Sequence, residues 1–325
     1  MKKNKLVVVG VGHVGSYVLA DAMKLGLFSE IAVIDSREDV AFGEALDQAH
    51  ATALTYMSNT TVRSGDYSEC ADADVIICAA GPSVLTTDKD AMPDRALLAE
   101  KNAEVIREVM TGITKYTKEA IVIMITNPLD TMVYIAENEF GYPKGRVFGT
   151  GTMLDSARLC YVVASNYNID PKSVTGYMMG EHGHTSFPVF SRLNVKGFGE
   201  DELDQVFEGK EPLNREKMGQ QVVKEAFAVL NNKGWTNAGV AQAAITLAKA
   251  VMLDERSVYP VSTTLNGQYG YNGDVALSMP CVIGRNGVEK QLEIKLDEQE
   301  TEWLHKSAKY IQDTMKVAKT GKDYL

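Results

Sequence analysis

The sequence has few of the residues that define several common protein classes. Only four cysteines occur among its 325 residues, at positions 70, 78, 160 and 281, and no two of them form a CxxC pair. This spacing excludes a zinc knuckle or a CxxC redox motif, so we expect no metal site and a cytoplasmic location. No apolar run approaches the roughly 20 residues that a membrane span needs, so we expect no membrane association.

Basic residues are also scarce relative to acidic ones. The chain carries 33 Lys and Arg against 43 Asp and Glu, a net charge of −10 at pH 7. Duplex affinity comes mainly from basic residues that neutralise phosphates, so this balance argues against a nucleic-acid partner. The 45% hydrophobic and 23% charged content is that of an ordinary globular protein and excludes a disordered or fibrous chain.

The first half of the chain alternates short apolar runs with longer helical patterns. The strands are apolar throughout, and the segments between them carry apolar residues at spacings of three and four. We predict strands at residues 6–9, 31–34, 75–80 and 120–126, and helices at 14–25, 38–57, 95–116 and 131–140. This alternation predicts an α/β fold with a doubly wound parallel sheet covered on both faces.

The pattern changes after about residue 150. We predict helices at 155–166, 214–231, 237–253 and 298–318, a strand at 175–179, and antiparallel ribbons at 191–197 and 275–296. These elements predict a second, C-terminal half of mixed α+β structure. No low-complexity linker separates the halves, so we expect a functional site in a cleft between them.

A glycine motif, GVGHVG, connects the first predicted strand to the first helix. Gly10 allows a tight turn, Gly12 lets the backbone approach a pyrophosphate, and Gly15 lets the helix pack on the strand. His13 and Val14 lie at the helix N-terminus, which provides NH groups and a partial positive charge. We therefore expect these five residues to bind a dinucleotide.

The second predicted strand ends at Asp35. A carboxylate there can accept hydrogen bonds from both ribose hydroxyls and would repel a 2′-phosphate, which predicts NAD rather than NADP. Gly81, after the strand at 75–80, is a further cofactor-binding candidate. From this half alone, a methyltransferase that binds adenosylmethionine or a fold without a nucleotide stays an alternative.

We assign residues 1–149 to an NAD-binding Rossmann domain and residues 150–325 to a catalytic, substrate-binding domain.

A second group of motifs surrounds a histidine in the second half. His182 lies in the run GEHGH, and a histidine titrates near neutral pH, so it can exchange a proton with a hydroxyl or carbonyl oxygen. Asp155 is the candidate carboxylate that fixes its tautomer. Arg158 follows three residues later on the same helical face, where it can hold a substrate carboxylate. His182 alone would favour a structural role, but the three residues together favour catalysis.

Two more residues are candidates for the same site. Asn127 follows a strand at the carboxyl edge of the sheet, where it can orient both a carbonyl and the cofactor; a simple strand-to-helix turn is the alternative. Arg95 ends the polar stretch 82–94, which is typical of a lid loop. An arginine brought over the substrate would polarise its carbonyl and exclude water, whereas the alternative is an ordinary surface arginine.

With these motifs in view, the chain resembles the NAD-dependent lactate/malate dehydrogenase family over essentially its whole length. The motifs GVGHVG, TNPLD, GTGTMLDSAR, GEHGH and KGWT occur in the order and approximate spacing of that family. The resemblance implies that His182 donates and accepts the proton, Asp155 is its partner, and Arg158 clamps the carboxylate. It also implies that Arg95 polarises the carbonyl and that Thr236 lines the substrate pocket.

The chain departs from the family pattern in the lid and beside the histidine. The lid is longer than in most members and is similar to that of L-2-hydroxyisocaproate dehydrogenases. Malate enzymes carry a second arginine in this loop, and none occurs between Gly81 and Arg95. A lysine cannot form the two parallel hydrogen bonds by which that arginine holds the far carboxylate, so oxaloacetate is disfavoured as a substrate. His184 stands where the family commonly has Asp or Asn.

The resemblance therefore implies an NAD-dependent L-2-hydroxyacid dehydrogenase, of the L-lactate or L-2-hydroxyisocaproate type. Its expected partners are a small 2-oxo or 2-hydroxy acid and further copies of the chain, in a homodimer or homotetramer. The alternatives are a malate dehydrogenase and a non-catalytic NAD-binding sensor module.

Overall fold

One large sheet organises the molecule. The computed structural model describes residues 4–83 and 95–324, without the side chains of 95–97. Nine strands lie in the order β14-β13-β12-β6-β5-β4-β1-β2-β3. Six of them are mutually parallel: β1 (Lys5–Val9), β2 (Glu30–Ile34), β3 (Thr61–Ser64), β4 (Val75–Cys78), β5 (Ile121–Met124) and β6 (Val147–Gly149). Their order, 3-2-1-4-5-6, is that of a dinucleotide-binding sheet, so the predicted doubly wound fold is confirmed.

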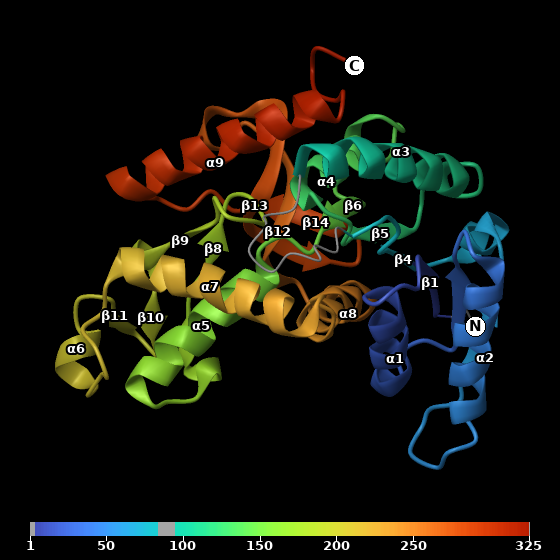
Figure 1. Cartoon of the computed structure of the whole chain (residues 1–325), viewed down its shortest axis with the longest axis horizontal. Helices are drawn as coiled ribbons and strands as arrows, with labels where there is room; N and C mark the ends of the chain where they lie inside the picture. Colours follow the sequence, from blue (N-terminus) through green and yellow to red (C-terminus); the bar gives the residue numbers. More distant parts are fainter. Residues whose placement is uncertain (1–3, 84–94, 325) are drawn as a thin grey trace.

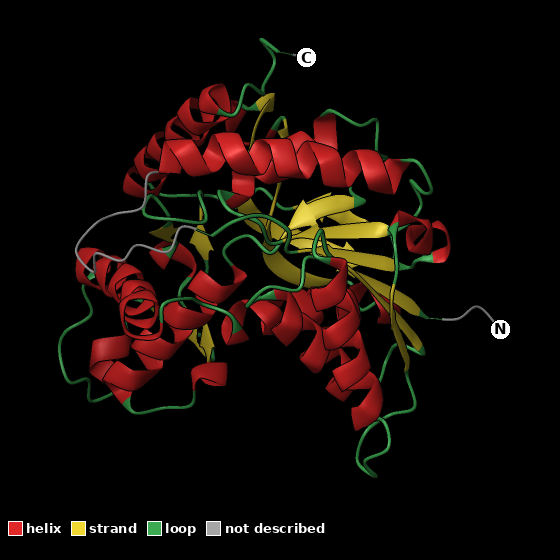
Figure 2. Ribbon diagram, turned by 45° about the vertical axis from the view of Figure 1, so that its right-hand side comes forward, coloured by secondary structure: helices red, strands yellow, loops and turns green. Residues whose placement is uncertain are grey.

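Helices cover both faces of this sheet, as Figure 2 shows. The helices of the first half are α1 (Gly15–Leu25), α2 (Glu38–Ala51), α3 (Arg95–Thr114) and α4 (Leu129–Asn138). On one face α1 packs against α2 and α8 (Ala238–Leu253), and on the other α3 and α4 pack against α9 (Glu298–Val317). Helices from both halves of the chain thus share each layer (Figure 1).

The second half completes the same sheet rather than building a separate one. Three antiparallel strands, β12 (Ser257–Asn266), β13 (Asn272–Gly284) and β14 (Gly287–Gln291), extend it, with Ser262 of β12 paired to Gly149 of β6. The expected ribbon at 275–296 therefore joins the first-half sheet. The expected boundary at 149/150 falls at the end of β6, and the division into two domains stays a prediction.

Further helices and two small sheets form the rest of the second half. Its further helices are α5 (Met153–Tyr167), α6 (Leu203–Val206) and α7 (Arg215–Lys233). Its small sheets combine β7 (Val174–Thr175) with β10 (Asn194–Val195) and β11 (Phe198–Gly199), and β8 (Met178–Met179) with β9 (Phe187–Pro188). Its short 3-10 segments are η2 (Pro171–Ser173), η3 (Phe190–Arg192) and η4 (Gln268–Gly270), and a longer one, η1 (Tyr67–Asp72), precedes β4 in the first half.

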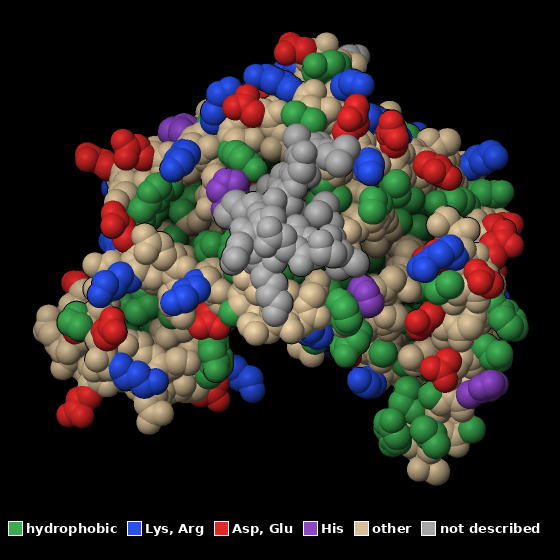
Figure 3. Space-filling model, viewed as in Figure 1, with side chains coloured by type: hydrophobic (Ala, Val, Ile, Leu, Met, Phe, Trp, Pro, Cys, Tyr) green, Lys and Arg blue, Asp and Glu red, His purple; other side chains and the backbone are tan. Residues whose placement is uncertain are grey.

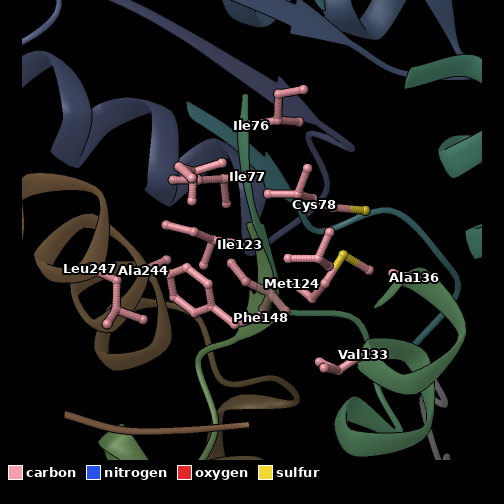
Figure 4. Packing of buried hydrophobic residues seen from close by; sticks show 14 of the residues in the cluster. Ile76, Ile77, Cys78, Ile123, Met124, Val133, Ala136, Phe148, Ala244 and Leu247 are labelled. Carbon is pink, nitrogen blue, oxygen red and sulfur yellow. The ribbon is translucent and has the colours of Figure 1, made fainter. Parts of the chain in front are cut away.

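The central strands are buried on both faces, which explains their uninterrupted apolar runs. Figure 4 shows Ile77, Ile123 and Phe148 toward Ala244 and Leu247 of α8. Neighbouring residues in the strands point the other way, and there Met124 packs near Val133 and Ala136 of α4. A smaller apolar cluster holds α5 against α6, α7 and the short strands.

Two expectations about the elements were wrong in detail, and three strands of the large sheet were not predicted. Helix α2 ends at Ala51 rather than at 57, because the Thr52 hydroxyl bonds the carbonyl oxygen of Ala49 (2.6 Å) and competes with helix continuation. The strand expected at 175–179 is split into β7 and β8. The strands β3, β6 and β12 were not predicted, and two of these are too short to show a periodicity.

Two features of the described residues concern membrane-spanning helices and metal sites. Among these residues, no helix has both the length and the apolar character for a membrane crossing. The same part of the chain contains no cluster of three or more His, Cys, Asp or Glu side chains that could hold a metal ion.

Candidate active site

The glycine turn between β1 and α1 has the backbone that a dinucleotide requires. Gly10 has φ +86°, and a Cβ there would lie 2.6 Å from the Ala80 backbone; a Cβ on Gly15 would lie 1.8 Å from the Gly10 carbonyl oxygen. At Gly12, in contrast, a Cβ would meet no atom within 4 Å. Gly10 and Gly15 are thus required by packing, whereas Gly12 leaves open space for a phosphate to approach the backbone.

Asp35 is fixed at the end of β2, beside this turn. Its carboxylate accepts hydrogen bonds from the backbone NH of Val11 (2.8 Å) and of Arg37 (3.0 Å). At the end of β4, Gly81 has φ +126°, and a Cβ there would lie 2.5 Å from Asn102 Oδ1. These residues lie at the carboxyl edge of the strands, where parallel sheets bind ligands, and they fit an NAD dinucleotide.

The predicted histidine and carboxylate are in contact. His182 Nδ1 lies 2.7 Å from Asp155 Oδ2, and both side chains are largely buried. Asp155 lies in the first turn of α5, and His182 lies in the loop after β8. Because Nδ1 is bound to the carboxylate, Nε2 is the ring nitrogen that can exchange a proton with a ligand.

The electrostatics of this pair favour a charged imidazolium. Burial lowers the pKa of His182, but the charge and hydrogen bond of Asp155 outweigh burial, so the pKa of His182 is raised above its ordinary value. Burial alone would raise the pKa of Asp155, yet His182 and Arg158 hold it below its ordinary value. His182 therefore keeps its proton to a higher pH than a free histidine.

A second carboxylate, Asp130 of α4, holds the backbone of the same histidine. Its two oxygens accept hydrogen bonds from the His182 NH (2.8 Å) and from the Ser262 hydroxyl of β12 (2.6 Å). Burial raises the pKa of Asp130 to about 7 despite these bonds. Asp130 is the last residue of the TNPLD motif, which does not indicate the long-range partners of this carboxylate.

Arg158 lies one turn along α5 from Asp155. Its Nη1 donates to Asp155 Oδ1 (2.9 Å), and the side chain is 15% exposed. This bond fixes the plane of the guanidinium and leaves its other NH groups for a ligand. The structure therefore brings His182, Asp155 and Arg158 together, as the sequence predicted.

Asn127 lies exposed at the end of β5, and its carbonyl oxygen is held by a residue that sequence reasoning missed. Asn102 of α3 donates from Nδ2 to the carbonyl oxygens of Asn127 (2.6 Å) and Pro82 (3.2 Å). It thereby joins the ends of β4 and β5, the two strands whose loops carry Gly81 and Asn127. No signal in the sequence distinguished Asn102 from other polar residues of α3.

Thr236 lies in the junction between α7 and α8. The next residue, Asn237, caps α8 and is buried, and α8 packs closely on α5. A Cβ on Gly239 would lie 2.7 Å from Leu154 Cδ1, next to Asp155 in the chain. Thr236 is thus close in the fold to the catalytic candidates of α5.

The remaining residues singled out in the sequence are Arg95 and His184. Arg95 begins α3, but its side chain and the lid at 84–94 lie outside the described residues. His184 Nδ1 lies 4.0 Å from Glu181 Oε2, and its ring meets Tyr310 of α9 edge-on, with the centroids 4.5 Å apart. His184 thus faces α9 rather than Asp155.

The doubly wound sheet with its glycine turn, together with the histidine–carboxylate–arginine cluster, is typical of a dinucleotide-dependent oxidoreductase. Both parts of the chain match models of one known family. Residues 4–149 match the family model for the lactate/malate dehydrogenase NAD binding domain, and residues 152–321 match that for the lactate/malate dehydrogenase alpha/beta C-terminal domain. The chain belongs to the lactate/malate dehydrogenase family.

Individual relatives cover nearly the whole chain. L-lactate dehydrogenase 2 of Clostridium acetobutylicum is 45% identical over 98% of this chain and 99% of its own. L-lactate dehydrogenase of Selenomonas ruminantium is 41% identical over 96% of this chain and 97% of its own. The solved minor L-lactate dehydrogenase of Enterococcus mundtii superposes with a TM-score of 0.90 at 30% identity, covering 97% and 98% of the two chains.

The two glycines of the turn give a matched pair of variants. Gly15→Ala places a methyl group against backbone, so we expect a loss of about 1–3 kcal/mol in stability and a lower Tm. Gly12→Ala meets no protein atom, so its Tm should equal the wild-type value while NADH binding weakens about tenfold or more. Thermal melts and NADH fluorescence titrations check both expectations, and equal Tm losses in the two variants would contradict them.

The pKa of His182 predicts a pH dependence. Reduction of a 2-oxo acid needs the protonated imidazole, so kcat/KM should fall as pH rises through the raised pKa of His182. Asp155→Asn removes the charge that raises this pKa, so the fall should begin at lower pH. We expect pH profiles of NADH oxidation to show this shift, with the exposed Asp313→Asn as the control. A profile of Asp155→Asn that matches the wild type would refute the assignment.

Proposed function

We propose that this chain is an NAD-dependent L-2-hydroxyacid dehydrogenase of the L-lactate type, which interconverts a small 2-oxo acid and its L-2-hydroxy acid. The observation that carries the proposal is the contact of His182 with Asp155, which Arg158 also binds. A proton donor, the carboxylate that pairs with it and an arginine that can bind the carboxylate of a substrate thus lie within one buried cluster. The relatives named L-lactate dehydrogenase support the same assignment.

The glycine turn and Asp35 would hold the NAD cofactor, which when bound would supply the hydride for the carbonyl carbon. The protonated His182 gives its Nε2 proton to the carbonyl oxygen as negative charge develops there. Asp155 stabilises the imidazolium and fixes the ring so that Nε2 faces the substrate. In the reverse direction, neutral His182 removes the proton from the hydroxyl group.

Arg158 holds the substrate carboxylate. A planar guanidinium binds a carboxylate with two parallel hydrogen bonds, which fixes the orientation of the carbonyl group beside it. The bond from Nη1 to Asp155 orients this guanidinium before the substrate arrives. Since the clamp and the acid share one carboxylate, substrate binding and proton transfer depend on the same side chain.

The remaining candidates complete the site. We assign to Asn127 the orientation of the carbonyl and the nicotinamide, to Thr236 the wall of the substrate pocket, and to Arg95 the polarisation of the carbonyl. The glycine turn, His13, Val14 and Asp35 bind the dinucleotide, together with Gly81. Asn102 and Asp130 act as positioning residues, because each holds the backbone of a site residue.

The substrate is tested by NADH oxidation with pyruvate, 2-oxobutyrate, 2-oxoisocaproate, phenylpyruvate and oxaloacetate at equal enzyme concentration. We expect pyruvate or a larger apolar 2-oxo acid to have the highest kcat/KM. Oxaloacetate as the best substrate would instead show a malate dehydrogenase. Tight NADH binding without reduction of any of these acids would show a sensor module and overturn the proposal.

Arg158→Lys tests the carboxylate clamp. A lysine keeps the charge but loses the fork, and hydrogen bonds to charged groups are worth about 1.5–3 kcal/mol. We therefore expect KM for the 2-oxo acid to rise about 10- to 100-fold while the Kd of NADH stays within about twofold. Steady-state kinetics and NADH titration measure the two values. Equal losses in both would contradict a role limited to the substrate.

We also propose a cytoplasmic homo-oligomer, either a dimer or a tetramer. The free thiols of all four cysteines fit a reducing compartment. Phe42 and Leu46 of α2 are 58% and 41% exposed, and Figure 3 shows hydrophobic side chains gathered beyond the end of this helix. Apolar patches of this kind are typical of interfaces.

Phe42→Glu places a charge in the proposed interface. We expect this variant to shift the mass measured by light scattering toward the 35.5 kDa of one chain. Tyr116→Glu, an exposed aromatic position near the end of α3, is the control. A wild-type protein that is already monomeric would refute the proposal.

A further inference from the structure

The junction between α7 and α8 contacts the glycine turn and the first turn of α1. The ring of Trp235 lies flat on the ring of His13, with centroids 3.9 Å apart and planes 1° from parallel. His13 belongs to the glycine turn of the cofactor-binding half, and Trp235 directly precedes Thr236 of the substrate-binding half. Figure 1 shows α8 beside α1, so the two rings meet where the halves of the chain pack together.

A second contact holds the same junction. The Lys233 ammonium lies 5.6 Å from the centroid of the Tyr17 ring, one turn along α1 from His13. Lys233 also donates to Asn237 Oδ1, which accepts the Ala238 NH (2.8 Å) and caps α8. The residues before and after Thr236 are therefore both held, Trp235 by the ring of His13 in the glycine turn and Asn237 by its role as the cap of α8.

The junction is also tied to the catalytic helix. The close approach of Gly239 to Leu154 places the first turn of α8 against the first turn of α5, which carries Asp155. Thr236 consequently lies between the turn that binds the cofactor and the helix that binds the substrate. Because Trp235 and Thr236 are neighbours in the chain, a displacement of Trp235 on His13 would move Thr236 relative to Asp155.

We infer that His13 and Trp235 form a positioning pair that couples the cofactor turn to the substrate pocket. This inference rests on the proposed function. The ring of His13 acts through Trp235, not on the substrate itself, and it holds Thr236 in place for the 2-oxo acid. A residue of the glycine turn thus helps to set the affinity for the second substrate, in addition to its backbone role toward the dinucleotide.

The kinetic test uses His13→Ala, which removes the ring, and His13→Phe, which keeps a flat ring for Trp235. Since aromatic pairs are worth about 0.5–1.5 kcal/mol, we expect His13→Ala to raise KM for pyruvate about two- to tenfold at saturating NADH. Both variants keep the His13 backbone NH that serves the dinucleotide, so kcat and the Kd for NADH alone should change less than KM does, and His13→Phe should restore KM. The matched control is His305→Ala, which removes an imidazole packed on Tyr271 away from the site.

Three kinetic outcomes would overturn the inference. An unchanged KM in His13→Ala would show that the ring contact does not position Thr236. A Kd for NADH that rises as much as KM would show that His13 acts only on the cofactor. Failure of His13→Phe to restore KM would show that the imidazole nitrogens matter, and not the stacked ring.

A spectroscopic test is independent of turnover. The chain has two tryptophans, so Trp303→Phe leaves Trp235 as the only one. In that background we expect His13→Ala to shift the emission of Trp235 to longer wavelength, because the ring loses its cover, and His13→Phe to leave it unshifted. Identical emission in all three proteins would overturn the contact. If the wild type reduces no 2-oxo acid, the proposed function fails while this measurement still reports on the ring pair.

Discussion

The hydrogen bond between His182 Nδ1 and Asp155 Oδ2 is the interaction on which the rest of the site depends. It fixes the ring tautomer, raises the pKa of the histidine and leaves Nε2 for the substrate. Its geometry is rigid because each partner has a second anchor. Arg158 binds the other oxygen of Asp155, and Asp130 holds the backbone NH of His182.

The continuous sheet explains why these anchors meet. Asp130 follows β5 in the first half of the chain, and its other oxygen accepts a hydrogen bond from Ser262 of β12 in the second half. Strand β6 lies between β5 and β12 and pairs with both, which brings the end of β5 close to β12. Because this one sheet carries strands of both halves of the chain, it holds the loop of His182 against the first half.

The sequence predicted the parts of the fold that have long, regular patterns. The buried strands β1, β2, β4 and β5 and all the long helices follow from apolar runs and periodicity. The strand β6 has three residues, too few for a pattern, and the place of β12 in the sheet depends on a pairing across more than a hundred residues. Such pairings follow from tertiary packing and leave no local signal.

The residues of the candidate site could likewise be predicted only in part from the sequence. His182, Asp155 and Arg158 occur in short motifs whose residue types indicate their chemistry, and the structure brings them into contact. Asn102 and Asp130 act through bonds to the backbone of residues far away in the sequence. Any polar residue can make such bonds, so residue type alone could not identify these two.

The role of His182 is tested most directly by the turnover of His182→Asn with NADH and the best 2-oxo acid, measured together with NADH binding on the same preparation. Asparagine keeps a polar side chain near Asp155 but cannot donate a proton as an acid at neutral pH. We expect an unchanged Kd for NADH and a kcat lower by about 10²–10⁴-fold. Turnover close to the wild-type rate would contradict the assignment of His182 as the proton donor.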